Sequence, residues 1–370
     1  MDQKVMVTAC ASYAPGTVRE AVRTVFDAYG GASAFLQNGR RVLLKPNLLM
    51  ARAPEEGTTT HPEVVSAVAE LLIEAGASVT IADSPGGPYN DICVSRVYRT
   101  CGMEEAARLS GATLNRDYTH KRVTYEGYAT RSFDLITPVA EADVVINLAK
   151  MKTHMMTYFT GAVKNMYGVV PGLTKTRYHA ELPGKQDFCR MVIDLCRAVA
   201  PVFSIIDGIE GMDGKGPSGG RVRPAGILVA SRNPFAADLA AMYLAGLKPE
   251  RSPIHENAWQ QGLVPRDAGG LTLSGDHTQP LDEPFIPPVQ GKVRTVSVLN
   301  YLPQALREPL QRLMIPAPSI TERCIGCGNC ARACPARAIV VKNGKASVSR
   351  QKCVRCYCCH ELCPIKAVKL

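Results

Sequence analysis

The sequence lacks long hydrophobic runs, is poor in aromatic residues and has no long run of basic residues. Its apolar runs are much shorter than the roughly 20 residues that cross a bilayer, and no charged segment followed by an apolar one opens the chain. We therefore expect a cytoplasmic protein with no membrane span. Aromatic residues make up only 6%, and no five lysines or arginines are consecutive, although the net charge is +10. Because nucleic-acid sites combine stacking platforms with basic stripes, we expect no nucleic-acid partner.

The fourteen cysteines are unevenly distributed along the chain. Nine of them lie between residues 324 and 363, at the spacings of metal ligands, and the chain shows no secretion signal. A small secreted protein would use so many cysteines for disulfides, whereas these spacings favour reduced thiolates that bind metal. We therefore expect the protein to work in a reducing compartment.

Apolar periodicity predicts alternating strands and helices in residues 1–275. The predicted strands cover residues 41–44, 78–82, 144–147, 203–206 and 227–230, and the predicted helices cover residues 62–75, 187–200 and 234–245. This order predicts an α/β domain with a parallel or mixed sheet and helices on both faces. Residues 276–316 are rich in proline and are interpreted as a connector, with an apolar piece at 293–299 and a helix at 304–313.

Residues 317–370 contain an internal repeat built on one cysteine pattern. The spacing C-x-x-C-x-x-C-x-x-x-C-P occurs twice, and a hairpin turn is expected between the copies at residues 342–345. The cysteines are Cys324, Cys327, Cys330 and Cys334 in the first copy, and Cys353, Cys356, Cys359 and Cys363 in the second. The repeat predicts a small α+β module with two facing halves, and it resembles the bacterial two-cluster ferredoxins.

Each copy of the pattern has the spacing that binds a 4Fe-4S cluster. The first three cysteines wrap around one cubane, and the fourth reaches the cluster of the other half. We therefore expect two 4Fe-4S clusters, one held by Cys324, Cys327, Cys330 and Cys363, the other by Cys353, Cys356, Cys359 and Cys334. The alternative is a pair of zinc sites, but zinc favours two cysteine pairs far apart in the sequence. Cys358 is interpreted as a spare thiol.

Polar residues follow the predicted strands of the large domain. Open α/β sheets bind ligands at the carboxyl ends of their strands, and lysines that converge there bind carboxylates or phosphates. The candidate substrate-binding residues are Lys45, Asn47, Asp83, Asn147, Lys152, Asn165 and Asp207. A small anionic substrate is therefore the expected ligand.

The candidate catalytic residues are Lys150, His154, Lys164 and His61. A histidine, or a lysine with a lowered pKa, could deliver the proton that accompanies a reduction. Two structural explanations remain open. The lysines and His154 could lie on the solvated face of a helix, and His61, which precedes a proline, could cap a helix.

The stretch 207–220 is the most glycine-rich part of the chain. Its backbone could approach a ligand closely, and Asp207, Glu210 and Asp213 could hold a divalent ion. A flexible lid and a plain long turn are both consistent with this composition. The stretch matches neither a Walker A loop nor G-x-G-x-x-G, so nucleotide binding is not predicted.

Six short motifs follow one another in a specific order. They lie at residues 43–47, 60–63, 83–86, 150–154, 161–165 and 207–208. As an ordered set they resemble the domain-of-unknown-function-362 family over about residues 5–250. Members of that family often carry a C-terminal two-cluster ferredoxin module and are usually described only as iron-sulfur cluster-binding proteins. The resemblance therefore implies the architecture and leaves the reaction open.

Three functional hypotheses follow. The favoured one is an oxidoreductase in which a soluble electron donor protein reduces the clusters and single electrons reduce a small anionic substrate, without a recognisable flavin or nicotinamide site. The second is a non-catalytic electron-transfer or assembly partner that docks another protein. The third is a ligase or transferase whose clusters are structural or redox-sensing, and activity that survives cluster loss would favour it.

Overall fold

The computed structural model describes residues 2–172, 174–182, 184–288 and 317–369. The strands of the large domain are β1 (Lys4–Ala9), β2 (Arg41–Pro46), β3 (Ser78–Ile81), β4 (Thr113–Leu114), β5 (His120–Thr124), β6 (Ser132–Ile136), β7 (Val144–His154), β8 (Tyr158–Thr160), β9 (Phe203–Asp213), β10 (Arg221–Ser231) and β11 (Thr272–Gly275). Its α-helices are α1 (Pro15–Asp27), α2 (Pro62–Glu74), α3 (Asp91–Thr100), α4 (Met103–Ser110), α5 (Thr137–Glu141), α6 (Ala162–Asn165), α7 (Thr174–Glu181), α8 (Lys185–Val199), α9 (Pro234–Leu244) and α10 (Pro253–Gln260). Its 3-10 helices are η1 (Ala32–Phe35), η2 (Pro54–Glu56), η3 (Met166–Val169), η4 (Pro249–Arg251) and η5 (Ala268–Gly270).

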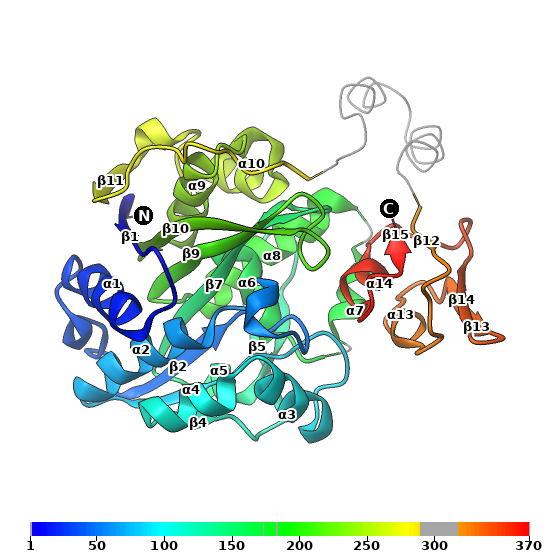
Figure 1. Ribbon diagram of the computed structural model, residues 1–370, viewed down its shortest axis with the longest axis horizontal. Helices are drawn as coiled ribbons and strands as arrows, with labels where there is room; N and C mark the ends of the chain where they lie inside the picture. The colour runs from blue at the N-terminus through cyan, green and yellow to red at the C-terminus, as the bar shows by residue number, and fades with distance from the viewer. Residues whose placement is uncertain (1, 173, 183, 289–316, 370) are drawn as a thin grey trace.

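A mixed sheet organises the large domain, which confirms the predicted α/β class (Figure 1). The strand order is β11-β1-β10-β9-β7-β2-β3-β4, and β8 pairs with β7 outside this path. The run from β9 through β7, β2 and β3 to β4 is parallel, whereas β10 is antiparallel to both β1 and β9. The parallel strands bring their carboxyl ends to one edge, where ligands bind in open α/β sheets.

The sheet separates two hydrophobic cores, because side chains alternate between its faces. In β2, Leu44 packs in a core with Val64 of α2, whereas its neighbour Leu43 packs in a core with Phe188 of α8. All these side chains are at most 1% exposed. Burial on both faces explains why the predicted strands contain continuous apolar runs, and it confirms helices on both faces of the sheet.

Three strands extend by at least six residues beyond the predicted ranges. The strand predicted at residues 144–147 continues to His154 as β7, the one predicted at 203–206 continues to Asp213 as β9, and the one predicted at 227–230 begins at Arg221 as β10. The prediction of a glycine-rich loop over 207–220 is therefore wrong for its first half, which is strand. Only residues 214–220 form the connection between β9 and β10.

The C-terminal module is a small α+β unit beside the large domain (Figure 1). Its elements are β12 (Ser319–Ile320), α13 (Asn329–Arg332), β13 (Ile339–Lys342), β14 (Lys345–Val348), α14 (Cys358–Glu361) and β15 (Val368–Lys369). β13 and β14 form the predicted hairpin, and β12 pairs with β15, so the two ends of the module meet. The predicted apolar piece at 293–299 and the predicted helix at 304–313 lie outside the described residues.

Specific hydrogen bonds join the module to the large domain. The Arg52 guanidinium donates to the carbonyl of Pro364 at 2.8 Å, and the Ser218 hydroxyl donates to the carbonyl of Glu361 at 3.0 Å. An added Cβ at Gly86 would meet the Leu362 side chain, so these two surfaces are in close contact. The end of α14 and the residues that follow it, up to Pro364, are thereby held against the large domain.

Across the described residues, no helix combines the length and the hydrophobicity that a membrane span requires.

Candidate functional site

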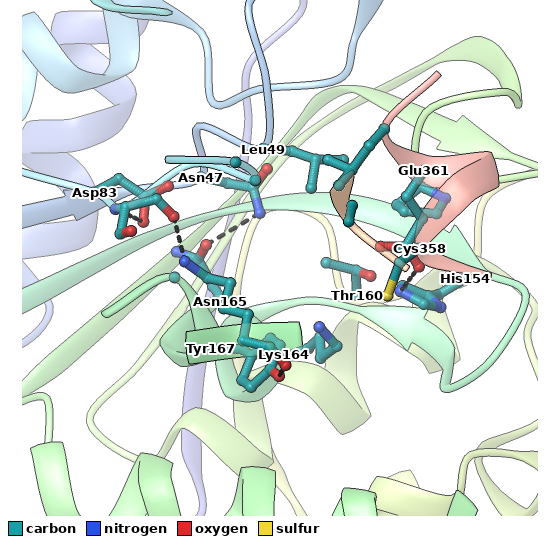
Figure 2. A pocket seen from close by; sticks show the side chains of 18 of the residues that line it. Asn47, Leu49, Asp83, His154, Thr160, Lys164, Asn165, Tyr167, Cys358 and Glu361 are labelled. Atoms are coloured by element: carbon teal, nitrogen blue, oxygen red, sulfur yellow. Dashed lines mark hydrogen bonds and ion pairs between the residues drawn. The ribbon is translucent and has the colours of Figure 1, made fainter. Parts of the chain in front are cut away.

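A cleft with a cavity volume of about 100 Å³ lies between the large domain and the module. Typical small-molecule sites measure about 300–1,000 Å³, so this cleft suits only a small ligand. Its walls come from β2, β7, α6 and α7, from the turn after β3, and from α14 of the module (Figure 2). The cleft brings together seven of the sequence-predicted site residues: Lys45, Asn47, Asp83, Lys152, His154, Lys164 and Asn165.

The base of the cleft is a network that neutralises Lys45. The Lys45 Nζ lies 2.8 Å from Asp83 Oδ1 and donates to Asn165 Oδ1 at 2.9 Å. Asp83 also accepts from two backbone amides, and Asn47 donates to Asn165 Oδ1 at 3.1 Å. The side chains of Lys45 and Asp83 are 1% and 3% exposed, so water screens this pair very little. Lys45 therefore stabilises the base of the cleft, with its charge balanced by Asp83.

Two further lysines of the cleft are hydrogen-bonded to neutral oxygens. Lys152 Nζ donates to Asn47 Oδ1 at 2.9 Å and to the Thr58 carbonyl at 2.7 Å. Lys175 Nζ donates to the carbonyls of Ser84 and Val170, each at 2.6 Å. Burial lowers the pKa of both lysines to about 7, and the charge of Lys150 adds to the decrease at Lys152. Their charged forms are therefore poorly compensated, and an anion in the cleft would stabilise them.

Among the lysines that line the cleft, Lys164 has the fewest polar contacts with described residues. Its Nζ lies 4.5 Å from the centre of the Tyr167 ring and 5.7 Å from that of Phe188. No hydrogen bond or ion pair joins it to another described residue. Burial lowers its pKa, and the Glu361 carboxylate opposes this decrease. Because Lys164 lines the cleft and its ammonium is not neutralised by a contact, it is the best placed cation for an anionic ligand (Figure 2).

A histidine and a carboxylate meet where the module contacts the cleft. His154 Nε2 lies 3.2 Å from Glu361 Oε1, and His154 Nδ1 accepts from the amides of Met156 and Thr157. Since Nδ1 is an acceptor, the proton of a neutral ring belongs on Nε2, facing Glu361. Burial acts to raise the pKa of Glu361, but His154 and Lys164 outweigh it and lower the pKa to about 2. The pair places one proton beside the cleft, held by groups from both domains.

Lys150 and Asp207 form a second network, apart from the described residues that line the cleft. The register of β7 and β9 places them opposite each other, and Lys150 Nζ lies 2.9 Å from Asp207 Oδ2. The Tyr13 hydroxyl donates to Asp207 at 2.9 Å and accepts from Lys150 at 2.6 Å. Both charged side chains are at most 1% exposed. These two residues therefore stabilise the sheet, and the expectation that they contact the substrate has no support in this geometry.

Two more of the predicted residues have structural contacts. His61 caps α2, because its Nδ1 accepts from the Glu63 amide at 3.2 Å, and its ring stacks on Tyr13 with 3.6 Å between ring centres. Asn147 donates to the Ala162 carbonyl at 2.9 Å. Neither residue is among the described residues that line the cleft. Helix capping is therefore the role that the structure supports for His61.

Burial and ion pairing also exclude a solvated helix face and weaken the case for a divalent-ion site. Lys150, Lys152 and His154 belong to the buried strand β7, so a solvated helix face is wrong for them. The carboxylates expected to hold a divalent ion are separated: Asp207 pairs with Lys150, whereas Asp213 lies 3.3 Å from Arg221. The negative charge of Asp207 is therefore already compensated by its buried salt bridge with Lys150.

Sequence reasoning missed five titratable residues of the cleft: Tyr167, Lys175, His179, Cys358 and Glu361. The first three lie on η3 and α7, shortly after a predicted motif, but no spacing marked them as site residues. For Glu361 a signal did exist, because it is one of only two acidic residues in the strongly basic segment 317–370. An isolated carboxylate in such a segment suggests a specific partner, here His154.

The cysteines of the module are arranged as donors for clusters. One small cavity is lined by Cys324, Cys327 and Cys330 of the first copy together with Cys363 of the second. Backbone amides donate to several of the sulfurs, including Cys324 and Cys363, as is usual for thiolate ligands. Among the described residues, no three His, Cys, Asp or Glu side chains could hold a single ion. A cubane spreads its thiolates around a larger body, so the donor set fits a cluster.

Comparison with known proteins gives matches to both parts of the chain. A family model described as a domain of unknown function (DUF362) matches residues 42–243, and a model described as a 4Fe-4S binding domain matches residues 318–340. A thylakoid-associated protein of Synechocystis sp. is 34% identical over 290 residues, which cover 76% of this chain and 86% of that protein.

Two solved structures are similar to parts of this chain. A lactate racemase apoprotein from Thermoanaerobacterium thermosaccharolyticum superposes with a TM-score of 0.36 and 12% identity, over 55% of this chain and 50% of the racemase. A protein from Thermotoga maritima superposes with a TM-score of 0.39 and 11% identity, over 63% of this chain and 59% of that protein. The chain thus spans about half the length of the first structure and about three fifths of the second.

Proposed function

Because the chain belongs to the DUF362 family and carries a C-terminal 4Fe-4S binding domain, we propose that it is an oxidoreductase that delivers single electrons to a small anionic substrate in the cleft. The observation that carries this proposal is the composition of the cleft wall. Cys358 and Glu361 of the cysteine-rich module line the same space as Lys152 and Lys164 of the large domain. The substrate site and the redox module therefore share one boundary.

The proposal assigns residues 1–275 to substrate binding, 276–316 to a connector and 317–370 to two 4Fe-4S clusters. Cys324, Cys327, Cys330 and Cys363 would hold one cluster, and Cys353, Cys356, Cys359 and Cys334 the other. When bound, the clusters supply electrons one at a time. Such clusters require reducing conditions, so we keep a cytoplasmic location and a soluble electron donor protein as parts of the proposal.

The large domain supplies charge and a proton. Lys164 binds the anionic group of the substrate, and Lys152 and Lys175 strengthen the positive potential around it. His154 holds a proton on Nε2 against Glu361 and is the proposed proton donor. Lys150 and His61, which have structural partners, are not proposed for catalysis, nor are Asn147 and Asp207 for substrate binding.

The proposed function is tested by reducing the purified protein anaerobically with dithionite and counting iron. We expect about eight irons per chain and the EPR signal of reduced 4Fe-4S clusters. The reduced protein is then mixed with small carboxylates and phosphates, and reoxidation of the clusters in the presence of one of them is the expected result. If the clusters are complete but none of these compounds reoxidises them, the protein is better described as an electron carrier or assembly partner.

Anion affinity should fall as the pH rises through about 7. Lys152 and Lys175 have pKa values of about 7, so both are charged below this pH and neutral well above it. Sulfate is a suitable probe because its own charge is constant over this range. We expect its dissociation constant to increase at least about tenfold between about pH 6 and about pH 9, since a charge-assisted hydrogen bond is lost. In a Lys175→Gln variant the binding should be weaker and less pH-dependent, and an equal pH dependence in both proteins would exclude Lys175.

A further inference from the structure

Nearly all of the net positive charge of the chain lies in the module. Residues 317–370 contain ten lysines and arginines and two acidic residues, so they carry eight of the ten net charges of the whole chain. Two clusters with their thiolates would remove about two charges each, which leaves the module basic. Of the two carboxylates, Glu361 is turned into the cleft against His154, and Glu322 pairs with Lys345. The outer surface of the module therefore has almost no free negative charge.

The basic residues are on the surface, and several surround the first cysteine copy. Nine of the ten are exposed: Arg323, Arg332, Arg337, Lys342, Lys345, Arg350, Lys352, Lys366 and Lys369. Arg323 directly precedes Cys324, and Arg332 donates to the carbonyl of Cys327 at 3.2 Å. The turn between β13 and β14 lies against the same loop, because an added Cβ at Gly326 would meet the Gly344 carbonyl.

The two cysteine copies differ in their surroundings. In the first copy Cys327 is exposed, and the neighbouring Ile325 is 64% exposed. In the second copy Cys353 and Cys359 are buried, and the adjoining Cys358 lines the cleft. The cluster of the first copy would thus lie near the outer surface of the module, and that of the second copy would lie towards the substrate.

We propose that an acidic one-electron carrier protein docks on the outer face of the module, around Arg323, Ile325 and Lys342, and passes its electron to the cluster of the first copy. The carrier loses one electron and that cluster gains one. An apolar centre ringed by lysines and arginines is complementary to an acidic protein with an exposed redox group. This inference rests on the proposed function, but it concerns the route by which electrons reach the protein and not the substrate.

The test measures binding, so it does not depend on turnover. The probe is an oxidised plant-type ferredoxin of net negative charge, with a fluorescent label, titrated with the cluster-loaded protein. The double variant Arg323→Glu/Lys342→Glu should weaken its binding at least about tenfold. The matched control is Arg19→Glu/Arg23→Glu, which changes the net charge equally on α1, on the opposite side of the large domain from the module (Figure 1). This control should bind like the unchanged protein.

Salt provides a second measurement. The Debye length shortens from about 30 Å at 0.01 M salt to about 8 Å at 0.15 M, so the affinity of the unchanged protein should fall steeply and that of the double variant only slightly. Reduced ferredoxin should also reduce the unchanged protein and the Arg19→Glu/Arg23→Glu control at similar rates. It should reduce the Arg323→Glu/Lys342→Glu variant more slowly. Iron content should be equal in all three proteins.

The inference is overturned if both double variants bind ferredoxin equally, whatever the cleft does with small anions. It is also overturned if the Arg323→Glu/Lys342→Glu variant loses binding to vesicles that contain phosphatidylserine while it keeps its affinity for ferredoxin, because the face would then serve a lipid surface. The proposed function fails independently, when ferredoxin reduces the protein normally but no small anion reoxidises it.

Discussion

Replacing Cys334 by alanine is expected to destroy the cluster of Cys353, Cys356 and Cys359 and to spare the other one. Iron should decrease from about eight to about four per chain, because one 4Fe-4S cluster loses a ligand. Mössbauer or EPR spectra of the remaining iron should show a single cluster type. The matched variant Cys363→Ala should also retain about four irons per chain. In that variant the cluster of Cys324, Cys327 and Cys330 should be lost and the other one retained.

This expectation rests on contacts between the two halves of the module. Cys363 of the second copy lines the cavity of the first copy. Burial raises the pKa of Cys353, and the charges of Cys356 and Cys334 act in the same direction, so Cys334 lies near the second set. Loss of the first-copy cluster in Cys334→Ala would show that each copy holds its own cluster. As a control, Cys358→Ala changes a buried cysteine outside both sets and should retain about eight irons.

Replacing Lys164 by methionine should weaken anion binding in the cleft roughly 10- to 150-fold, because a hydrogen bond to a charged group contributes about 1.5–3 kcal/mol. Methionine keeps most of the apolar stem over Tyr167, so the fold and both clusters should be retained. Sulfate titration and iron content measure the two effects. The control Lys121→Met removes an exposed lysine of β5 and should leave affinity unchanged.

Lys150→Met is a contrasting variant, because Lys150 is paired with Asp207 in the interior of the sheet. Removing one member of a buried pair usually costs about 3–5 kcal/mol, so the main effect should be a lower unfolding temperature. Two results would contradict these roles. One is a Lys150→Met variant that keeps full stability but binds anions more weakly. The other is a Lys164→Met variant whose anion affinity is unchanged.

The sequence is most informative where geometry is set by short spacings. The cysteine pattern predicts the module and its hairpin, and the continuous apolar runs around Leu43 and Leu44 predict a sheet covered on both faces. These features depend on residues that are neighbours in the chain, so a single sequence contains the necessary information.

The site is harder to predict because its contacts join distant residues. The polar residue Asn147 suggests the end of a strand, yet β7 continues for seven residues as a fully buried strand. Its lysines and His154 find partners in distant segments of the chain. Lys150 and Lys164 look equivalent in the sequence, but only Lys150 finds a carboxylate, at a position 57 residues further along the chain. His154 likewise meets Glu361 only because the module docks on the large domain.

The position of Glu361 has a thermodynamic consequence. This side chain belongs to α14, between two cysteines of the module, yet it completes the wall of a cleft whose other charges come from the large domain. Folding of such a small module is coupled to metal loading, so a chain without its clusters would present an incomplete cleft. Linkage then works in both directions: an anion that favours the complete cleft also favours retention of iron. Under the proposed function, anion binding and cluster loading would therefore favour each other.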